Sequence, residues 1–408
     1  MPVHPVGMRP RVAIVSDPMV QRGGAERVVE AFAEAFPEAP IFAILYSFEN
    51  GPASLRSRVR ESWLGRIPGA ARRHRYFLPF YGKAVESFDL SEFDVILSSH
   101  HTAAKGLLRG AAQVHVCYCH TPMRALWERT HEELAALPAA ARPAAGAMLE
   151  RLRVWDYVTA ARVDRFVANS RLTQLRIRKH YGRDSELLYP PIDTERFTPG
   201  GEVEDYYLVA SRAVPYKRID LAVEATARAG RKLTLVGDRH RLVDAPHVTS
   251  LGHVTNDRLV QLMRGARALL FPQHEDFGMT ALEMNACGRP VIAYGSGGAV
   301  ETVVDGYTGI LVPEQTPEAF VAGIERFEKL NFDPLTLRFH AERFSRERFV
   351  ESLREVIARA WSEAQEPRAI RRSVSLQRRP DVELRADFVD DGVGELRRRG
   401  VSAEAAGS

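Results

Sequence analysis

The second half of the chain holds two carboxylates, Glu275 and Glu283, on either side of a short turn. The pattern predicts a strand at 268–271 and a helix at 280–287, which puts Glu275 in the connecting loop and Glu283 on the helix. Both would face a crevice where Gly278 lets a ligand approach the backbone. Paired carboxylates can accept hydrogen bonds from sugar hydroxyls. A carboxylate at a helix start also stabilises the helix by about 0.3–1 kcal/mol, but capping explains one of the two more easily than both.

Two cations five residues apart, Arg212 and Lys217, follow another predicted strand at 207–210. Pro215 stiffens the turn between them, so the two side chains could clamp a diphosphate without a metal ion. A solvated loop is the alternative, because charged residues are mostly exposed. Their position at the end of a strand favours the binding interpretation.

The first half contributes a glycine turn and a histidine. Gly23 and Gly24 precede a predicted helix at 25–36, where backbone N–H groups could face a phosphate. A tight turn without a ligand explains the same glycines equally well. His120 follows the carboxyl end of a predicted strand at 114–118 and precedes a turn at Pro122, a place that favours a role in a cleft.

Composition excludes several classes of protein. The chain has 408 residues, more than one compact core usually holds, and its net charge of +4 is too mild for a protein that coats nucleic acid. No phosphate-binding P-loop and no G-x-G-x-x-G turn occurs. The three cysteines form no disulfide framework, and no second Cys/His pair accompanies Cys117, Cys119 and His120, so we expect no metal site.

Hydropathy predicts a cytoplasmic protein. Residues 1–10 lack the apolar core of a secretory signal, and no uncharged apolar run reaches the roughly 18 residues that span a bilayer.

Strand and helix patterns alternate along the chain, which predicts an α/β protein with mostly parallel sheets. We expect one Rossmann-like domain at 8–195 and a second at 202–340, separated by a linker rich in turn residues and facing each other across a cleft. A helix at 344–362 would cross back to the first domain. The arginine-rich tail at 366–408 is expected to be largely disordered, with a small edge strand as an option at 381–389. Further strands are predicted at residues 11–16, 41–46, 94–98, 165–168, 232–236, 247–251 and 291–293.

Seven short motifs occur in an order that resembles the family 4 glycosyltransferases of the GT-B fold. They cover nearly the whole chain apart from the tail, and they are Gly23-Gly24-Ala-Glu26, Cys119-His120-Thr-Pro-Met-Arg124, Ala168-Asn-Ser170, Tyr189-Pro-Pro-Ile-Asp193, the segment from Arg212 to Lys217, the pair Glu275 and Glu283 with seven residues between them, and Gly297-Gly298-Ala-Val-Glu301.

The resemblance implies a retaining, metal-independent transfer of a hexose from a nucleotide sugar, with no cofactor besides that donor. Arg212 and Lys217 would bind the diphosphate, Glu283 the ribose, and Glu275 the donor sugar. His120 would reach the sugar and phosphate from the first domain. The remaining donor-side residues implied are Gly23, Gly24, Phe277, Gly278 and Met279, with Gly237, His253 and Val254 on the side of the nucleotide base.

The variants around His120 and Lys217 most resemble a bacterial mannosyltransferase branch that builds cell-surface polysaccharides or glycolipids. This implies GDP-mannose as donor and a glycan or lipid-linked acceptor. A UDP-sugar donor, a nucleotide-sugar epimerase of the same fold, and a non-catalytic partner of another transferase remain as alternatives.

Residues 55–83 carry eight basic residues against a single acid, Glu61, and aromatic residues are interleaved with them. One interpretation is a surface that docks on anionic lipid, which would attach the protein to the inner face of the cell membrane. A solvated helical hairpin explains the pattern equally well. Nucleic acid is the poorer partner, because no recognised binding module accompanies the charge.

Overall fold

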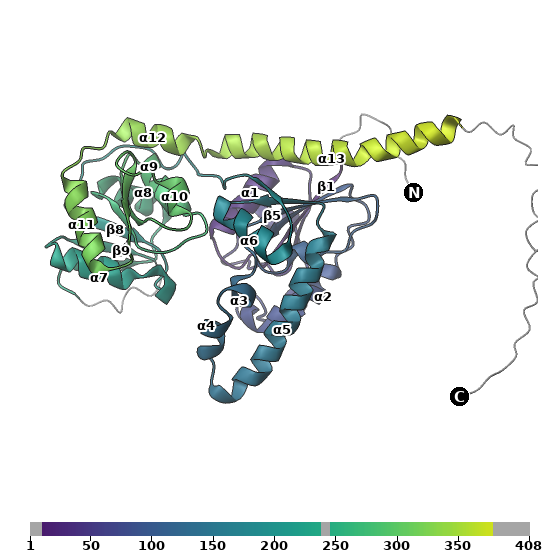
Figure 1. Cartoon of the computed structure of the whole chain (residues 1–408), viewed down its shortest axis with the longest axis horizontal. Helices are drawn as coiled ribbons and strands as arrows, with labels where there is room; N and C mark the ends of the chain where they lie inside the picture. The colour runs from purple at the N-terminus through teal and green to yellow at the C-terminus, as the bar shows by residue number, and fades with distance from the viewer. Residues whose placement is uncertain (1–9, 238–244, 378–408) are drawn as a thin grey trace, which may run out of the picture. The chain divides into compact units, whose positions relative to one another are not determined.

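The computed structural model describes residues 10–237 and 245–377, and each half of the chain builds one parallel sheet (Figure 1). We call residues 10–195 the N-terminal lobe and residues 202–342 the C-terminal lobe. Both lobes belong to one compact body that ends at Trp361.

The sheet of the N-terminal lobe has seven strands in the order β3-β2-β1-β4-β5-β6-β7, and all its pairings are parallel. Strands β1, β4 and β5 are buried throughout, as expected for a sheet with both faces covered. The strands are β1 (Val12–Ser16), β2 (Ile41–Ala43), β3 (Val59–Glu61), β4 (Val95–His100), β5 (Val114–Cys119), β6 (Arg165–Ala168) and β7 (Ser185–Leu187).

The helices of this lobe bury apolar faces against the sheet or extend from it. Helix α1 buries Val28, Val29 and Phe32, the spacing that predicts it. Helix α6 begins at the hydroxyl of Ser170, which accepts from the Thr173 N–H at 3.1 Å, and it ends at Gly182, whose φ is 64°. The helices are α1 (Gly24–Ala35), α2 (Tyr81–Glu86), α3 (Arg124–Trp127), α4 (Thr130–Ala135), α5 (Arg142–Thr159) and α6 (Arg171–Tyr181).

The sheet of the C-terminal lobe has six parallel strands in the order β10-β9-β8-β11-β12-β13. Two buried clusters cover its two faces, one formed with helices α7 and α11 and the other with α8, α9 and α12. The elements are β8 (Tyr207–Ala210), α7 (Ile219–Arg228), β9 (Leu233–Val236), β10 (Val248–Gly252), α8 (Asn256–Gly265), β11 (Leu269–Phe271), α9 (Met279–Ala286), β12 (Val291–Tyr294), α10 (Ala299–Thr302), β13 (Gly309–Val312), α11 (Pro317–Glu328) and α12 (Pro334–Glu342).

The last helix, α13 (Arg346–Gln377), returns to the N-terminal lobe. The Phe349 ring stacks on Phe32 of α1 with centroids 6.2 Å apart, and the Arg354 guanidinium donates to the Ala35 carbonyl at 3.0 Å. This confirms the predicted crossing helix. The helix continues to Gln377, past the predicted end at 362 and into the segment 366–377 that we expected to be disordered. The rest of that tail, including the optional strand at 381–389, lies outside the described residues.

The predicted strands all correspond to strands of the structure, whereas β3, β7 and β13 were not predicted. These are short, and the first two close the edges of the N-terminal sheet. Helices α3 to α6, α11 and α12 were also not predicted. The alanine-rich sequence at 135–147, which leads into α5, has no periodic apolar pattern.

Candidate active site

A cleft of about 470 Å³ lies between the carboxyl ends of the strands of the two sheets, where open α/β folds bind ligands. It receives side chains or backbone from both lobes. The predicted residues that line it are Gly23, Gly24, His120, Arg212, Lys217, Glu275, Phe277, Gly278 and Met279.

Lys217 and Glu275 form an ion pair on the C-terminal side of the cleft. The two side chains are only 14% and 21% exposed, so water screens the pair weakly. Burial, together with the neighbouring Arg212, lowers the pKa of Lys217 to about 8. Lys217 is therefore charged at neutral pH and loses its proton in mildly alkaline solution.

Arg212 extends from the end of β8 towards the N-terminal lobe. Its guanidinium donates to the side-chain oxygen of Gln21 at 3.1 Å. A neutral amide oxygen leaves the full positive charge of Arg212 in place, so an anion in the cleft can still attract it.

The glycine-rich turn at 295–298 supports the loop that carries Glu275. The Gly298 N–H donates to the Glu275 carbonyl at 2.8 Å, and the His274 ring lies 3.0 Å from the Ser296 hydroxyl. A Cβ on Gly298 would lie 2.2 Å from the Cα of Phe277, so only glycine fits there. The Gly298 N–H is therefore occupied by this loop.

The glycine turn before α1 is also tied internally. The Gly23 N–H donates to the carboxylate of Glu26 at 3.0 Å, and burial raises the pKa of that carboxyl. Gly24 faces the other lobe, since a Cβ there would lie 3.1 Å from the sulfur of Met279. Gly24 therefore lies close to the C-terminal wall of the cleft.

Glu283 lies on α9 and is 2% exposed, and it does not itself line the cleft, although its partner Arg27 does. Its carboxylate is paired with the guanidinium of Arg27 on α1, and this negative charge raises the pKa of Arg27. The two residues are 256 positions apart, so no local pattern indicates the pairing.

His120 follows β5 and lines the cleft from the N-terminal lobe. Its Nε2 lies 2.8 Å from the hydroxyl of Ser99 on β4. Burial, together with nearby His101, lowers the pKa of His120 to about 3, so the ring is neutral at physiological pH. It can therefore offer a hydrogen bond but no positive charge.

His101 is a cleft residue that our sequence reasoning missed. It follows β4 directly, and its ring centroid lies 6.1 Å from that of His120. The signal available was the pair His100-His101 just after the predicted strand at 94–98. Position at the carboxyl end of a central strand is the same argument that singled out His120.

The three residues expected near the nucleotide base do not line this cleft. The N–H of Gly237, at the end of β9, donates to the carbonyl of Gly252 at 2.9 Å. His253 and Val254 follow β10, and Val254 packs against the core of the C-terminal lobe. The loop at 238–244 that follows Gly237 lies outside the described residues.

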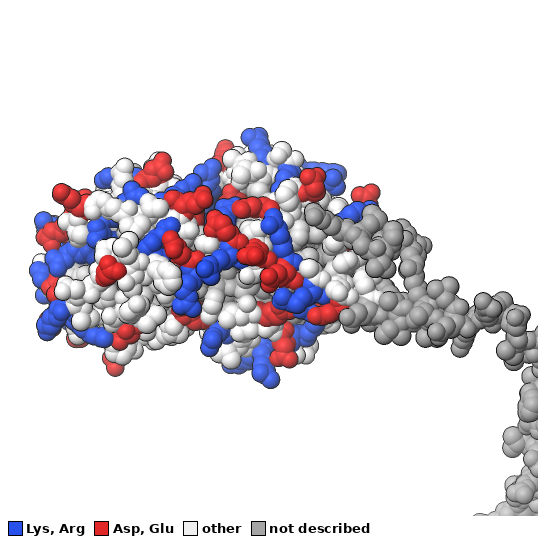
Figure 2. Space-filling model, turned by 90° about the horizontal axis from the view of Figure 1, so that it is seen from above, with Lys and Arg blue, Asp and Glu red and all other residues white. Residues whose placement is uncertain are grey.

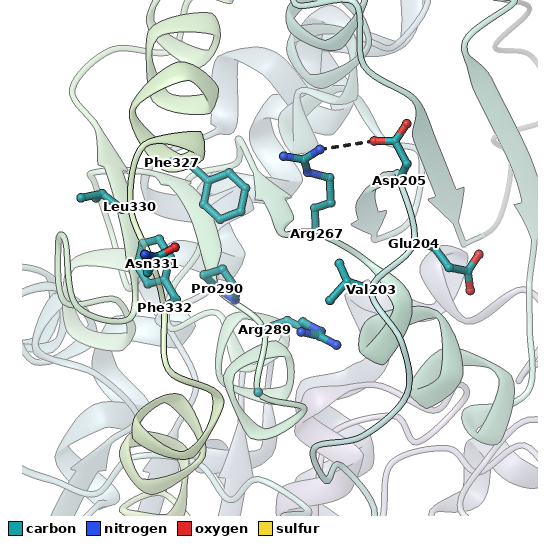
Figure 3. Close-up of a pocket in the computed structure, with 11 residues that line it drawn as sticks. Val203, Glu204, Asp205, Arg267, Arg289, Pro290, Phe327, Leu330, Asn331 and Phe332 are labelled. Carbon is teal, nitrogen blue, oxygen red and sulfur yellow. Dashed lines mark hydrogen bonds and ion pairs between the residues drawn. The ribbon is translucent and has the colours of Figure 1, made fainter.

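A second hollow, of about 350 Å³, lies at the opposite edge of the C-terminal sheet, next to the residues that precede β8, β11 and β12. Figure 3 shows Arg267 pointing to Asp205, with an ion-pair distance of 3.3 Å, beside the ring of Phe327. None of the predicted functional residues lines this hollow. The residues with candidate chemistry therefore gather at one edge of the sheet.

Within residues 10–237 and 245–377, no group of three or more His, Cys, Asp or Glu side chains could hold a metal ion. In the same part of the chain, no helix has both the length and the apolar character that crossing a bilayer needs.

Two family models match consecutive parts of the chain. The model described as "Glycosyltransferase Family 4" matches residues 22–196, and "Glycosyl transferases group 1" matches residues 193–347. The boundary between them coincides with the linker between the two lobes.

Curated relatives include "D-inositol 3-phosphate glycosyltransferase" of Geodermatophilus obscurus, 33% identical over 264 residues, or 54% of this chain and 57% of the relative. The protein of the same name from Mycolicibacterium smegmatis is 30% identical over 283 residues, or 60% of this chain and 65% of the relative. The chain thus matches between half and two thirds of the length of these relatives.

Solved structures resemble the whole fold. The Anabaena Alr3699/HepE structure in complex with UDP has a TM-score of 0.61 at 19% identity, covering 85% of this chain and 99% of that one. Sucrose-phosphate synthase from Thermosynechococcus elongatus has a TM-score of 0.60 at 20% identity, covering 89% and 100%. Two parallel-sheet lobes with this likeness show the GT-B fold. Together the two family models match residues 22–347, so this part of the chain is similar to the glycosyltransferases of family 4 and group 1.

Proposed function

We propose that the protein transfers a hexose from a nucleotide sugar to a hydroxyl group of an acceptor, with retention of configuration. The observation that carries this proposal is the single cleft that collects Arg212, Lys217 and Glu275 from one lobe and His120 from the other. Cations suit a diphosphate, and a carboxylate and a neutral imidazole suit sugar hydroxyls.

In this proposal the two cations stabilise the charge that grows on the departing diphosphate. Arg212 and Lys217 both line the cleft, where cations already placed around the diphosphate stabilise a transition state that gains negative charge. Because they supply the positive charge themselves, we propose that transfer needs no metal ion.

Glu275 and His120 would orient the donor sugar. Glu275 is held by its own backbone on the turn at 295–298, so its carboxylate is fixed before substrate arrives. Glu283 would bind the ribose hydroxyls. Its present partner is Arg27, so this role requires the guanidinium to leave the carboxylate when the nucleotide binds.

The donor we propose is GDP-mannose, on the resemblance of the motifs around His120 and Lys217 to bacterial mannosyltransferases. A UDP-sugar is the alternative, because Anabaena Alr3699/HepE was solved with UDP-glucose, with a TM-score of 0.63 and 18% identity. A thermal-shift screen across GDP, UDP and ADP sugars separates these donors, since a ligand that binds the folded state raises the melting temperature.

The acceptor we propose is a glycan or a lipid-linked sugar in cell-surface polysaccharide or glycolipid synthesis. The names of the curated relatives add D-inositol 3-phosphate as an acceptor to test. Incubation of the donor with and without acceptor decides the reaction class, because an epimerase would convert the donor alone.

Replacement of Glu275 by Ala tests the assigned chemistry. We expect Glu275→Ala to abolish transfer while the circular dichroism spectrum stays unchanged. The exposed variant Glu347→Ala on α13 serves as control and should retain full activity. Full activity of Glu275→Ala would refute the proposed site.

We also propose that the stretch 55–83 docks on anionic lipid of the inner face of the cell membrane. It is built of short 3₁₀ turns, strand β3 and the start of α2, not of the helical hairpin we considered. Tyr76 is 82% exposed and Phe80 47%, and the arginines at 72, 73 and 75 are exposed beside them. Aromatic and basic side chains at one surface are the combination that interfaces of anionic membranes favour. Arg58 is not part of this surface, because it donates to carbonyls at the end of α1.

Sedimentation with anionic vesicles tests this surface. Replacement of Arg72, Arg73 and Arg75 by Ser should release the protein from the vesicles, whereas the same change at Arg151, Arg178 and Arg348, which are exposed elsewhere, should not. Unchanged binding of the first triple variant would reject the docking surface.

A further inference from the structure

The loop that follows β4 carries a second imidazole whose position is fixed by a buried carboxylate. Asp17, at the end of β1, is 1% exposed. Its two oxygens accept four backbone N–H groups, from residues 101 to 104, at distances between 2.6 and 3.0 Å. Such a set of bonds holds both the carboxylate and the loop in one conformation.

The same carboxylate also lies next to the ring of His101. Its Oδ2 is 3.4 Å from Nδ1 of His101. Because an anion beside Nδ1 favours the tautomer with the proton on that nitrogen, Nε2 is left with its lone pair. The side chain lines the cleft and is 39% exposed, so a bound molecule can reach this lone pair.

A lone pair facing the cleft needs a hydrogen-bond donor. The phosphates of a nucleotide sugar present acceptor oxygens, so they do not suit it, whereas hydroxyl groups do. In the proposed site His120, whose ring centroid is 6.1 Å away, contacts the donor sugar. The hydroxyl that attacks the sugar belongs to the acceptor, and no hydrogen-bond acceptor is yet assigned to it in that site.

We infer that His101, oriented by Asp17, accepts a hydrogen bond from the reacting hydroxyl of the acceptor and aligns it with the donor sugar. This role rests on the proposed transfer reaction and adds an acceptor-side residue to it. Asp17 acts through His101 and through the loop, as a positioning residue.

Replacement of His101 by Leu and by Gln tests the inference. The probes are the nucleotide sugar that gives the largest thermal shift, D-inositol 3-phosphate as acceptor, and water as acceptor in the hydrolysis reaction. We expect His101→Leu to lower turnover with either acceptor by about tenfold to a hundredfold, as misaligned reactants do. His101→Gln keeps a hydrogen-bond acceptor and should recover part of the rate.

A binding measurement separates this role from a structural one. The thermal shift caused by the free nucleoside diphosphate should be the same for His101→Leu and the unchanged protein. Added imidazole should raise the turnover of His101→Ala, which a folding defect would not allow. His131→Leu, on the exposed helix α4, is the matched control and should behave as the unchanged protein does.

Three results would overturn the inference. Unchanged turnover of His101→Leu would show that the ring does not contact the acceptor. Loss of the diphosphate thermal shift would assign the ring to the donor instead. If the unchanged protein turned over no nucleotide sugar, the proposed transfer itself would be rejected, and this role with it.

Discussion

The two lobes line the cleft with different sets of side chains. The C-terminal lobe supplies the charges of Arg212, Lys217 and Glu275. The imidazoles that line the cleft, His101 and His120, come from the N-terminal lobe, whose charged lining residues all lie around the start of α1, at positions 22, 26 and 27. The pKa of His120 is lowered to about 3, so its ring adds no charge near neutral pH. The charges on the outer surface show no such division, because basic and acidic side chains alternate over the face seen in Figure 2.

This contrast indicates that the two lobes bind different parts of the substrates. Fixed charges suit the nucleotide diphosphate, which is itself charged, and neutral groups suit the hydroxyls of sugars. Two of the charged residues that the N-terminal lobe brings to the cleft already have partners, since Glu26 accepts the Gly23 N–H and Arg27 is paired with Glu283. Other charged groups of this lobe are held in its interior. Asp17 is held by backbone amides, and Lys105 lies 2.7 Å from Asp156 with both side chains fully buried.

The largest effect is expected from removing a charge on the C-terminal side. Lys217→Ala should lower transfer by about a hundredfold to a thousandfold, the range for loss of one group that stabilises transition-state charge. Initial rates at saturating donor measure it. Lys179→Ala, exposed on α6, is the control. Equal rates for both variants would contradict the role proposed for the charges of the C-terminal lobe.

A backbone change beneath the same loop should be nearly as damaging. Gly298→Ala places a methyl group 2.2 Å from the Cα of Phe277 and must displace the loop that carries Glu275. We expect the KM for the donor to rise and the rate to fall by about tenfold to a hundredfold. Gly146→Ala on α5 has no atom within 4 Å of the new methyl group and should be silent.

A substitution in the interior of the N-terminal lobe can destabilise the fold without changing a residue that lines the cleft. Asp156→Ala leaves the buried Lys105 ammonium without its carboxylate and should destabilise the fold by about 3–5 kcal/mol. Chemical denaturation measures the loss. A change within error would mean that the Thr159 hydroxyl, 2.9 Å from the same ammonium, is sufficient for it.

The pH dependence of kcat/KM should reflect the ionisation of Lys217 in the C-terminal lobe and not that of His120. With a pKa of about 8, Lys217 loses its proton as the pH rises, so kcat/KM should fall about tenfold per pH unit above that value. His120, with its pKa of about 3, should add no acidic limb near neutral pH. Lys217→Arg should move the alkaline limb upward, and a limb that stayed in place would assign it to another group.

The smallest effect is expected from removing the Ser99 hydroxyl, which contacts the ring of His120. Ser99→Ala removes the hydrogen bond of 2.8 Å to Nε2 and should lower the rate about fivefold, the worth of one such bond. Ser99→Thr, which keeps a hydroxyl, should restore most of the activity. A thousandfold loss would mean that the ring depends on Ser99 for more than its orientation.

Sequence reasoning reached the fold and much of the cleft because both depend on local order. Alternating strands and helices predict parallel sheets, and residues such as His120 and Lys217 stand at strand ends, which share one edge. The sequence did not reveal the features that depend on contacts between residues far apart in the chain. Glu283 meets Arg27 across 256 residues, His101 owes its place to Asp17, and the turn at 295–298 supports a loop, which composition cannot show.

The pairing of Arg27 with Glu283 has a consequence for measured affinities. A nucleotide that takes over this carboxylate trades one partner for another, and its dissociation constant then reports a difference between two interactions. In an Arg27→Ala protein, no guanidinium of residue 27 would compete with the nucleotide for the Glu283 carboxylate. Nucleosides, which have a ribose but no phosphate, should reveal this difference most clearly.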